Sequence, residues 1–398
     1  MNLLYIFSLL QIFIYLIVVP AIRFYLYDIN IDYKLSVVMF FLFFFIFGGC
    51  LYNKKKVRKK YSANLLNINY TKLGFFIIYC WIVLNFIISM QYGLYDRRIG
   101  TENAAELFAS LPLPILISFR FFEIALPFLI SVLIIKKITY SINLNENLLL
   151  ILLFFSFFSL GAANSRSAFV ILIITILIFI QNRVEKEKFK KIAIKSVMAA
   201  IFVLLLVQVY RLNTVELHTS DYLGAEILQR LDGLELISEV IKIHGLEFFG
   251  PNQSALFNPL ISALPFLPMS AELKSIGLTT IKSVVLSDEL GSNLKDYNSF
   301  IILDIYYVSG LIGICIAGFF MGLLIRIIDG NIFYTKGIII QFCLIAASIN
   351  LIFLEREFFG MLIFFVRDFV IIMAIYYTLM KKNTFNDKAA VNSGSRLG

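Results

Sequence analysis

The chain has 398 residues, of which 60% are hydrophobic and 15% are charged, and its mean hydropathy is +0.86. Soluble domains contain about 45–50% apolar and about 25% charged residues, so this composition excludes a soluble globular protein. The net charge of +9 comes mostly from short basic connections between apolar segments, where basic residues anchor membrane topology and contact anionic lipid. We therefore expect an integral membrane protein that does not bind nucleic acid.

Ten apolar segments approach the length of about twenty residues that a helix needs to cross about 30 Å of hydrocarbon. The fifth and sixth are short and nearly contiguous, so one re-entrant unit is an alternative to two spans. The sequence thus predicts an all-α polytopic membrane protein with about ten transmembrane helices. The predicted spans are 2–20, 35–51, 73–90, 113–135, 148–162, 166–181, 193–210, 303–325, 337–354 and 361–380.

Basic residues follow the second, fourth, sixth and tenth predicted spans, which sets the orientation. They occupy 54–60, 136–137, 183–195 and 381–382. Because basic short loops stay in the cytoplasm, we expect a multi-pass membrane protein with both termini cytoplasmic.

This orientation divides the chain into four regions. The first, 1–210, holds transmembrane helices 1–7, and the second, 211–299, is one large loop on the outer side between helices 7 and 8. Residues 300–380 hold helices 8–10, and 381–398 form a cytoplasmic tail. The loop carries both histidines, eleven acidic and six basic residues. We expect the chemistry at this polar insertion, and more specifically at its junction with the spans.

The insertion begins with a predicted amphipathic helix, Leu223 to His244, because its apolar residues have helical spacing and its opposite face is polar. Such a helix either lies on the membrane surface or roofs a cavity to which it presents Arg230 and Asp232. Prolines between 251 and 268 argue against a regular span there and favour a re-entrant or surface-dipping segment. Residues 274–290 are expected to form a short helix.

Three arginines lie in the outer part of the predicted membrane region. Arg120 and Glu123 share one face of the fourth span, so they form an internal ion pair or, alternatively, Arg120 faces an anionic head group. Arg166 lies at the outer turn between spans five and six, where it anchors the span end or contacts a phosphate. Arg211 opens the insertion at the aqueous boundary.

A carboxylate, Asp304, lies at the outer end of the eighth span beside the insertion. It can pair with an arginine there or take a proton from a sugar hydroxyl. A histidine of the insertion, His244, can also serve as a general base near neutral pH. Further along this span, Gly318 and Gly322 have the spacing that predicts close packing against another helix.

The sequence predicts neither a metal site nor a cofactor. All four cysteines lie in or beside spans without CxxC spacing, and the two histidines are 26 residues apart outside any ligand motif. Walker A, GxGxxG and GxSxG motifs are absent from the sequence, which disfavours a nucleotide-sugar enzyme or an ATP-driven pump.

Several features together resemble the Wzy-type O-antigen (oligosaccharide repeat-unit) polymerases. The spans are rich in Phe and Ile, and a Ser165-Arg166-Ser167 turn follows the fifth span. The large outer loop contains Gln229-Arg230-Leu231-Asp232-Gly233. The sequence Asp304-Ile305-Tyr306-Tyr307 precedes a glycine-rich span. The similarity covers nearly the whole chain as architecture, through short motifs.

The resemblance implies a GT-C-like fold in the bacterial inner membrane, in which 211–299 form one large periplasmic loop. It implies that the protein joins undecaprenyl-diphosphate-linked oligosaccharides at the periplasmic face. It implies a chain-length regulator and a flippase of the same pathway as partners, besides membrane lipids. Arginines are then expected to bind the diphosphate of the donor while a carboxylate or histidine acts as base. The expected diphosphate-binding residues are Arg120, Arg166, Arg211 and Arg230, and the candidate bases are Asp232, His244 and Asp304.

Two other functions stay open. An O-antigen ligase, which moves the glycan onto a lipid core, has the same architecture. A lipid-linked oligosaccharide flippase is a transporter, for which two similar halves and short loops are expected, and the sequence has neither.

Overall fold

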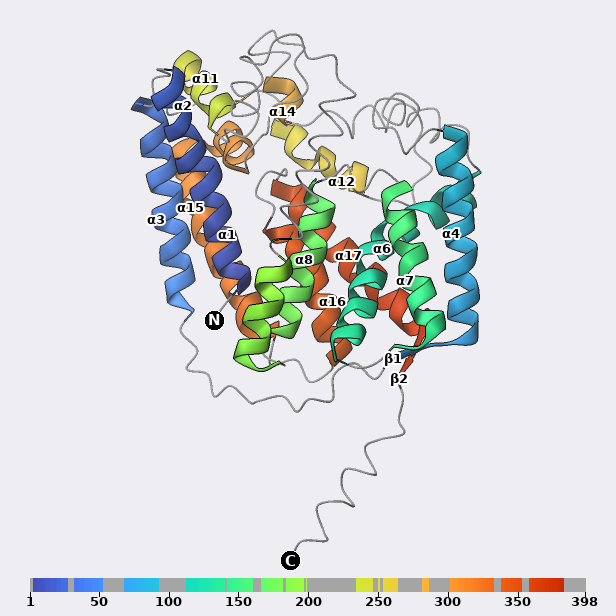
Figure 1. Ribbon diagram of the computed structural model, residues 1–398. Helices are drawn as coiled ribbons and strands as arrows, with labels where there is room; N and C mark the ends of the chain where they lie inside the picture. Colours follow the sequence, from blue (N-terminus) through green and yellow to red (C-terminus); the bar gives the residue numbers. More distant parts are fainter. Residues whose placement is uncertain are drawn as a thin grey trace, which may run out of the picture. The chain divides into compact units, whose positions relative to one another are not determined.

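The computed structural model (Figure 1) describes residues 3–27, 32–52, 68–92, 112–139, 142–159, 166–181, 184–196, 198, 234–245, 250, 253–263, 281–285, 301–332, 338–352 and 358–382. Within these ranges every regular element is a helix except two three-residue strands, so the structure agrees with an all-α membrane protein. Among the described residues, five helices are long and apolar enough to cross a membrane, namely Leu3–Leu26, Lys72–Gln91, Leu113–Ile138, Ile301–Asn331 and Phe358–Leu379.

The described part of the chain also holds three shorter apolar helices that overlap predicted spans, namely Val37–Leu51, Leu144–Phe157 and Ile339–Leu351. The fifth and sixth predicted spans are two separate helices, α7 (Leu144–Ser159) and α8 (Arg166–Ile180). Most of the seventh, 193–210, lies outside the described residues, so the number of ten spans stays a prediction.

The chain forms two compact units. Unit 1 combines 1–57, 208–335 and 347–367, and therefore holds the start of the chain and the described pieces of the insertion. Its elements are α1 (Leu3–Phe13), η1 (Ile14–Val18), α2 (Val19–Tyr27), α3 (Asp32–Leu51), α11 (Glu235–His244), η3 (Gln253–Phe257), α12 (Asn258–Ala263), α14 (Ile281–Val284), α15 (Ile301–Asn331), η6 (Ile349–Leu351) and the start of α17 (Phe358–Leu379).

The first apolar segment is one helical run whose hydrogen bonding changes just before a proline. Pro20 lacks an amide hydrogen, and its ring would collide with the carbonyl of Leu16 in a regular α-helix. The chain widens there into the π-turn η1, in which the amide of Val19 donates to the carbonyl of Ile14. The segment therefore continues through Pro20 into α2.

Helices α3 and α15 lie side by side (Figure 1) and pack backbone to backbone at glycines. A Cβ on Gly322 would lie 2.0 Å from the carbonyl oxygen of Phe45, and one on Gly48 would lie 2.1 Å from that of Phe319. Gly318 faces α3 in the same way. The close packing predicted for Gly318 and Gly322 is confirmed.

The far ends of these helices show how they run. Tyr52, just after α3, donates from its hydroxyl to Asn331 at 3.2 Å, and the amide of Tyr5 in α1 donates to Asp329 at 3.3 Å. The end of α15 therefore lies beside the end of α3 and the start of α1. Spans two and eight thus run parallel, and span one runs opposite, as the predicted order of spans requires.

Helix α15 is interrupted at Gly310, whose φ of 58° and ψ of −156° are not helical. We call the part before the break, Ile301–Ser309, the α15 arm. Every residue from Ile301 to Tyr307 is buried, whereas Ile312, Ile316 and Phe320 after the break expose an apolar stripe. At 1.5 Å per residue the part after Gly310 is by itself long enough to cross about 30 Å of hydrocarbon.

Unit 2 combines 58–207, 336–346 and 368–398. In it, Trp81 donates from its indole nitrogen to Ser118 at 2.8 Å, and its ring lies 5.6 Å from that of Phe122. These contacts join its first two long helices. Its elements are β1 (Ile68–Tyr70), α4 (Lys72–Tyr92), α6 (Leu113–Thr139), α7, α8, most of α16 (Ile338–Ser348), the end of α17 and β2 (Met380–Lys382).

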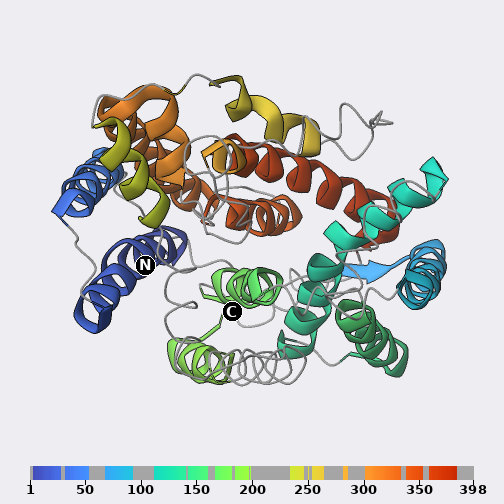
Figure 2. The same cartoon turned by 90° about the horizontal axis from the view of Figure 1, so that it is seen from above.

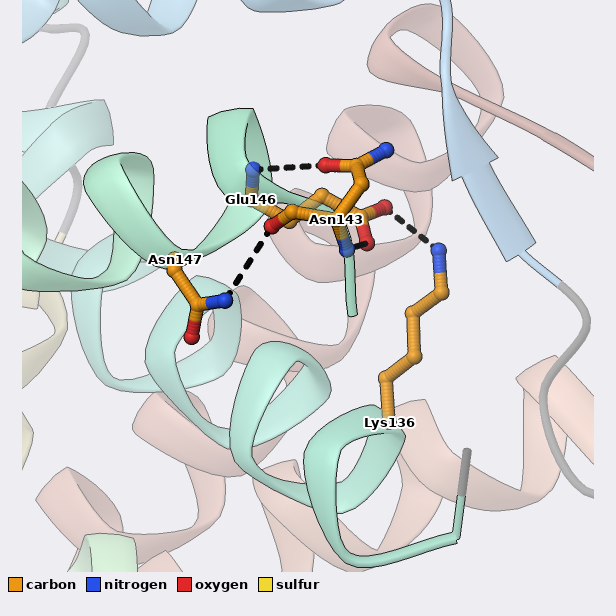
Figure 3. Close-up of polar contacts among 4 residues, drawn as sticks. All are labelled: Lys136, Asn143, Glu146 and Asn147. Atoms are coloured by element: carbon orange, nitrogen blue, oxygen red, sulfur yellow. Dashed lines mark hydrogen bonds and ion pairs between the residues drawn. The ribbon is translucent and has the colours of Figure 1, made fainter. Parts of the chain in front are cut away.

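A buried ion pair closes the hairpin between α6 and α7 (Figure 3). Lys136, in the last turn of α6, pairs with Glu146, in the first turn of α7. Both charges complement the helix dipoles at these ends. Asn143 and Glu146 also form a capping box, because the amide of Glu146 donates to the side chain of Asn143 at 2.8 Å and the amide of Asn143 to Glu146 at 3.4 Å.

The two strands form a short antiparallel ribbon in which Tyr70 is opposite Met380. The amide of Thr71 extends the ribbon by donating to the carbonyl of Leu379 at 3.0 Å. Gly74 lies so close to that carbonyl that a Cβ would be 2.2 Å from it. The start of α4 is therefore fastened to the end of α17.

Candidate functional site

The α15 arm is the part of unit 1 where the insertion meets the membrane helices. Helix α11 packs on α3 and α15, and Figure 2 shows it lying across them. Its residues Leu236, Ile237, Val240 and Ile241 are buried, whereas Ile243 is exposed. The last part of the predicted amphipathic helix is therefore confirmed, because α11 ends at His244 as expected and its apolar face covers protein. The predicted first part, 223–233, lies outside the described residues.

Asp304 of the arm binds the first turn of α17. Its Oδ2 accepts a hydrogen bond at 2.9 Å from the amide of Phe358, the first residue of that helix. The first amides of a helix have no partner within it and form the positive end of its dipole, so a carboxylate there is stabilising. Asp304 thus caps α17 from a position remote in sequence.

Tyr306 of the arm binds the end of α11. Its hydroxyl donates to the carbonyl oxygen of Gly245, which directly follows His244. Gly245 has a φ of 80° and its amide donates to the carbonyl of Ile241 at 2.8 Å, which ends the helix. The left-handed backbone favours glycine at this position. The arm therefore holds the residue that follows His244.

Tyr307 binds the next part of the insertion. The amide of Gly250 donates to the carbonyl of Tyr307 at 2.7 Å. A Cβ on Gly250 would lie 2.0 Å from Cε1 of the Tyr307 ring, so only glycine allows this approach without rearrangement. In addition, the rings of Phe257 in η3 and Phe359 in α17 lie 4.8 Å apart. The arm and α17 together fasten the insertion to the membrane helices.

The burial of the arm determines what its carboxylate can do. Asp304 is only 1% exposed and already accepts a backbone hydrogen bond. A sugar hydroxyl does not reach a carboxylate that is this buried, so in this conformation the geometry supports a capping role for Asp304. The residues that the structure describes contain no group of three potential metal ligands among His, Cys, Asp and Glu.

The other predicted site residues are described only in part. His244 is the last residue of α11 in unit 1. In unit 2, Arg120 lies within α6 and Arg166 begins α8. The side chains of all three residues lie outside the described residues. Asp232, Arg211 and Arg230 lie wholly outside them. The structure therefore places Asp304 on the same arm as Tyr306, which contacts the residue after His244. The predicted diphosphate-binding set stays a prediction.

Sequence reasoning missed several residues that matter in the structure. Arg23 of α2 is buried, with only 4% of its surface exposed. The sequence feature that could have revealed it is its position as a lone cation at the end of the first apolar segment. The buried pair of Lys136 and Glu146 was also missed, although the Asn143-x-x-Glu146 spacing is a capping-box signature. The hydroxyl of Tyr306 gave no signal, because its partner is a backbone carbonyl.

Compared with protein-family models, with curated proteins and with solved structures, the chain matches none of them.

Proposed function

We propose that this chain is a membrane glycosyltransferase that polymerises polyprenyl-diphosphate-linked oligosaccharide repeat units at the periplasmic face of the bacterial inner membrane. The observation that carries the proposal is the α15 arm, where Asp304, Tyr306 and Tyr307 attach α17 and the insertion to a long apolar helix. A substrate with a lipid anchor and a polar glycan reacts at the boundary of the membrane, which is where such a junction of spans and polar insertion lies in the proposed topology. The resemblance to the Wzy-type polymerases supports the same function, with a GT-C-like arrangement of ten spans and both termini cytoplasmic.

The proposed reaction is a displacement at the anomeric carbon of the growing chain. A hydroxyl oxygen of the acceptor repeat unit forms the new glycosidic bond, while the bond from the anomeric carbon to the diphosphate oxygen breaks. The hydroxyl proton passes to a base, and polyprenyl diphosphate leaves with the bonding electron pair. No nucleotide is needed, because the donor carries its own leaving group.

Charged residues have two roles in this scheme. Arg120, Arg166, Arg211 and Arg230 stabilise the negative charge that develops on the departing diphosphate. His244 or Asp232 takes the proton, and Asp304 holds α17 in place, because its carboxylate is buried and accepts the Phe358 amide.

A deletion of the gene in its host, analysed by gel electrophoresis of the surface polysaccharide, tests the proposal. Loss of the long ladder with a single repeat unit still attached to the lipid core supports polymerisation. Bare core without any repeat unit contradicts it and indicates a ligase or a flippase instead. Direct assay of membranes with a lipid-linked repeat unit then separates these two, because a flippase forms no glycosidic bond.

Complementation of the deletion strain tests the arginines. Arg166→Ala and Arg211→Ala are expected to shorten or abolish the ladder at normal expression. Lys242→Ala is the matched control, since Lys242 is an exposed cation of the insertion. The contact described for it is an ion pair with the neighbouring Glu239 at 2.6 Å. Normal chain lengths from both arginine variants would remove them from the proposed diphosphate site.

A further inference from the structure

The structure assigns to Tyr306 a positioning role for His244, the last residue of α11. The hydroxyl of Tyr306 donates to the carbonyl oxygen of Gly245, so it holds the backbone that directly follows His244. This inference rests on the proposed function, because it treats His244 as the base that receives the proton of the acceptor hydroxyl.

The anchoring side of this contact is rigid. Tyr306 is fully buried in the α15 arm, and the arm is fixed on either side of it by the Asp304 bond to Phe358 and the Tyr307 bond to Gly250. A tyrosine held in this way presents its hydroxyl at a fixed place. The position of the Gly245 carbonyl is therefore determined by the arm.

On the anchored side, apolar packing holds α11 as far as Ile241, whereas the residues at the very end of the helix are less constrained. Helix α11 ends at His244, and Gly245 has a φ of 80° that a flexible glycine can leave at little cost. Residue Ile243 is exposed, and a Cβ on Gly245 would meet nothing within 4 Å. Among the described residues, the hydrogen bond from the Tyr306 hydroxyl is thus the polar contact that holds this helix end against the arm.

Fixing the helix end matters because a base acts only within hydrogen-bond reach of the proton that it takes. A displacement of 1 Å can cost about 100-fold in rate. Removal of the Tyr306 hydroxyl is therefore expected to lower kcat for polymerisation on the order of 10- to 100-fold. KM for the lipid-linked repeat unit is expected to change much less, since Tyr306 is buried and does not contact substrate.

The adjacent tyrosine provides a matched control. Tyr306→Phe and Tyr307→Phe each remove one hydroxyl from equally buried rings on the arm. The contact of Tyr307 with the insertion uses its backbone carbonyl, which Tyr307→Phe retains. Membranes with each variant are assayed for kcat and KM with a lipid-linked repeat unit, alone and combined with His244→Gln. Hydrogen exchange of peptides covering 235–245 reports how readily the end of α11 opens, independently of activity.

The positioning role predicts a lower kcat and faster exchange over 235–245 for Tyr306→Phe, with neither change in Tyr307→Phe. It also predicts that Tyr306→Phe has no further effect in the His244→Gln background, since the hydroxyl acts through that residue. Equal kcat for the two tyrosine variants, full activity of His244→Gln, or additive losses in the double variant would overturn it. Wild-type membranes that form no polymer refute the proposed function itself, a separate result.

Discussion

The carboxylate of Asp304 accepts a hydrogen bond at 2.9 Å from the amide of Phe358, 54 positions along the chain. A similar contact occurs at the other end of the same helix, where Asp329 accepts from the amide of Tyr5 at 3.3 Å. Helix α15 therefore carries a buried carboxylate at each end, and each one caps the first turn of another helix. These caps explain why an apolar helix retains two acidic residues, since buried carboxylates need hydrogen-bond donors.

The cap role of Asp304 predicts a specific difference between two substitutions. Asp304→Ala removes the acceptor and should lower the free energy of unfolding by about 0.5–2 kcal/mol, the usual effect of losing a helix cap. Asp304→Asn retains an acceptor oxygen and should keep most of the stability and of the polymerising activity. Thermal unfolding in detergent and membrane assays measure the two effects.

A base role for Asp304 predicts the opposite pattern. Asp304→Asn would then abolish activity at unchanged stability and remove the acidic limb of the pH–rate profile. That result would restore Asp304 to the list of candidate bases.

The crossing of α3 and α15 depends on glycine at position 322. A Cβ there would lie 2.0 Å from the backbone carbonyl oxygen of Phe45, and a backbone atom cannot move aside cheaply. Gly322→Val is therefore expected to separate the two helices and to cost about 1–3 kcal/mol or more, as overpacking does. Ile312→Ala, at a side chain 73% exposed on the same helix, is the control. Thermal stability in detergent that is equal for both variants would contradict the close approach.

The break at Gly310 depends on a backbone conformation that only glycine adopts readily. Any side chain at φ 58° and ψ −156° is strained by about 1–3 kcal/mol. Gly310→Ala should lower thermal stability accordingly, whereas Cys315→Ala further along the helix should have a small effect. An unchanged melting temperature for Gly310→Ala would show that α15 runs straight through this position.

The buried ion pair of unit 2 predicts unequal effects for two neighbouring lysines. Lys136→Met leaves Glu146, which is 3% exposed, without its cation, and breaking such a pair costs about 3–5 kcal/mol. Lys137→Met removes an exposed lysine that contacts only Asn147 at 3.3 Å among the contacts described for it, and should change little. Adding Glu146→Gln to Lys136→Met should restore part of the loss. Equal melting temperatures for the two single variants would contradict the pairing.

Tyr70 predicts a loss of stability at alkaline pH. Burial, and secondarily the negative charge of Glu146, raise the pKa of Tyr70 well above its ordinary value. The unfolded chain then loses this proton above about pH 10 while the folded chain keeps it, so stability falls as the pH rises beyond that value. In Tyr70→Phe this part of the alkaline loss should vanish. Unfolding measured in urea between pH 8 and 11 compares the two, and parallel curves would refute the prediction.

The membrane helices could be predicted from the sequence because lipid contact demands long apolar segments. The glycine pair Gly318 and Gly322 was predictable for a similar reason, since close helix packing selects small residues at fixed spacing. Helices of unit 2 such as α7 and α8 likewise lie within a few residues of the predicted spans.

The arm and its contacts were not predictable. An aspartate can serve as a helix cap or as a general base, so the sequence left both roles open for Asp304. Its partner is the backbone amide of Phe358, and a backbone amide leaves no signature in a sequence. The hydroxyl of Tyr306 poses the same difficulty. The break at Gly310 was hidden because the segment around it is mostly apolar, and hydropathy does not distinguish a straight helix from an interrupted one.

The ribbon of β1 and β2 has a consequence for the order of assembly. Thr71 and Leu379, which extend it, are 308 positions apart in the chain. Strand β1 and the start of α4 leave the ribosome early, whereas the partner strand β2 is made only after α17. Unit 2 therefore cannot close during most of synthesis, and its early helices must wait in the lipid bilayer for the last one. A stop codon after Leu379 would leave every helix of this unit in the membrane with the closing strand missing.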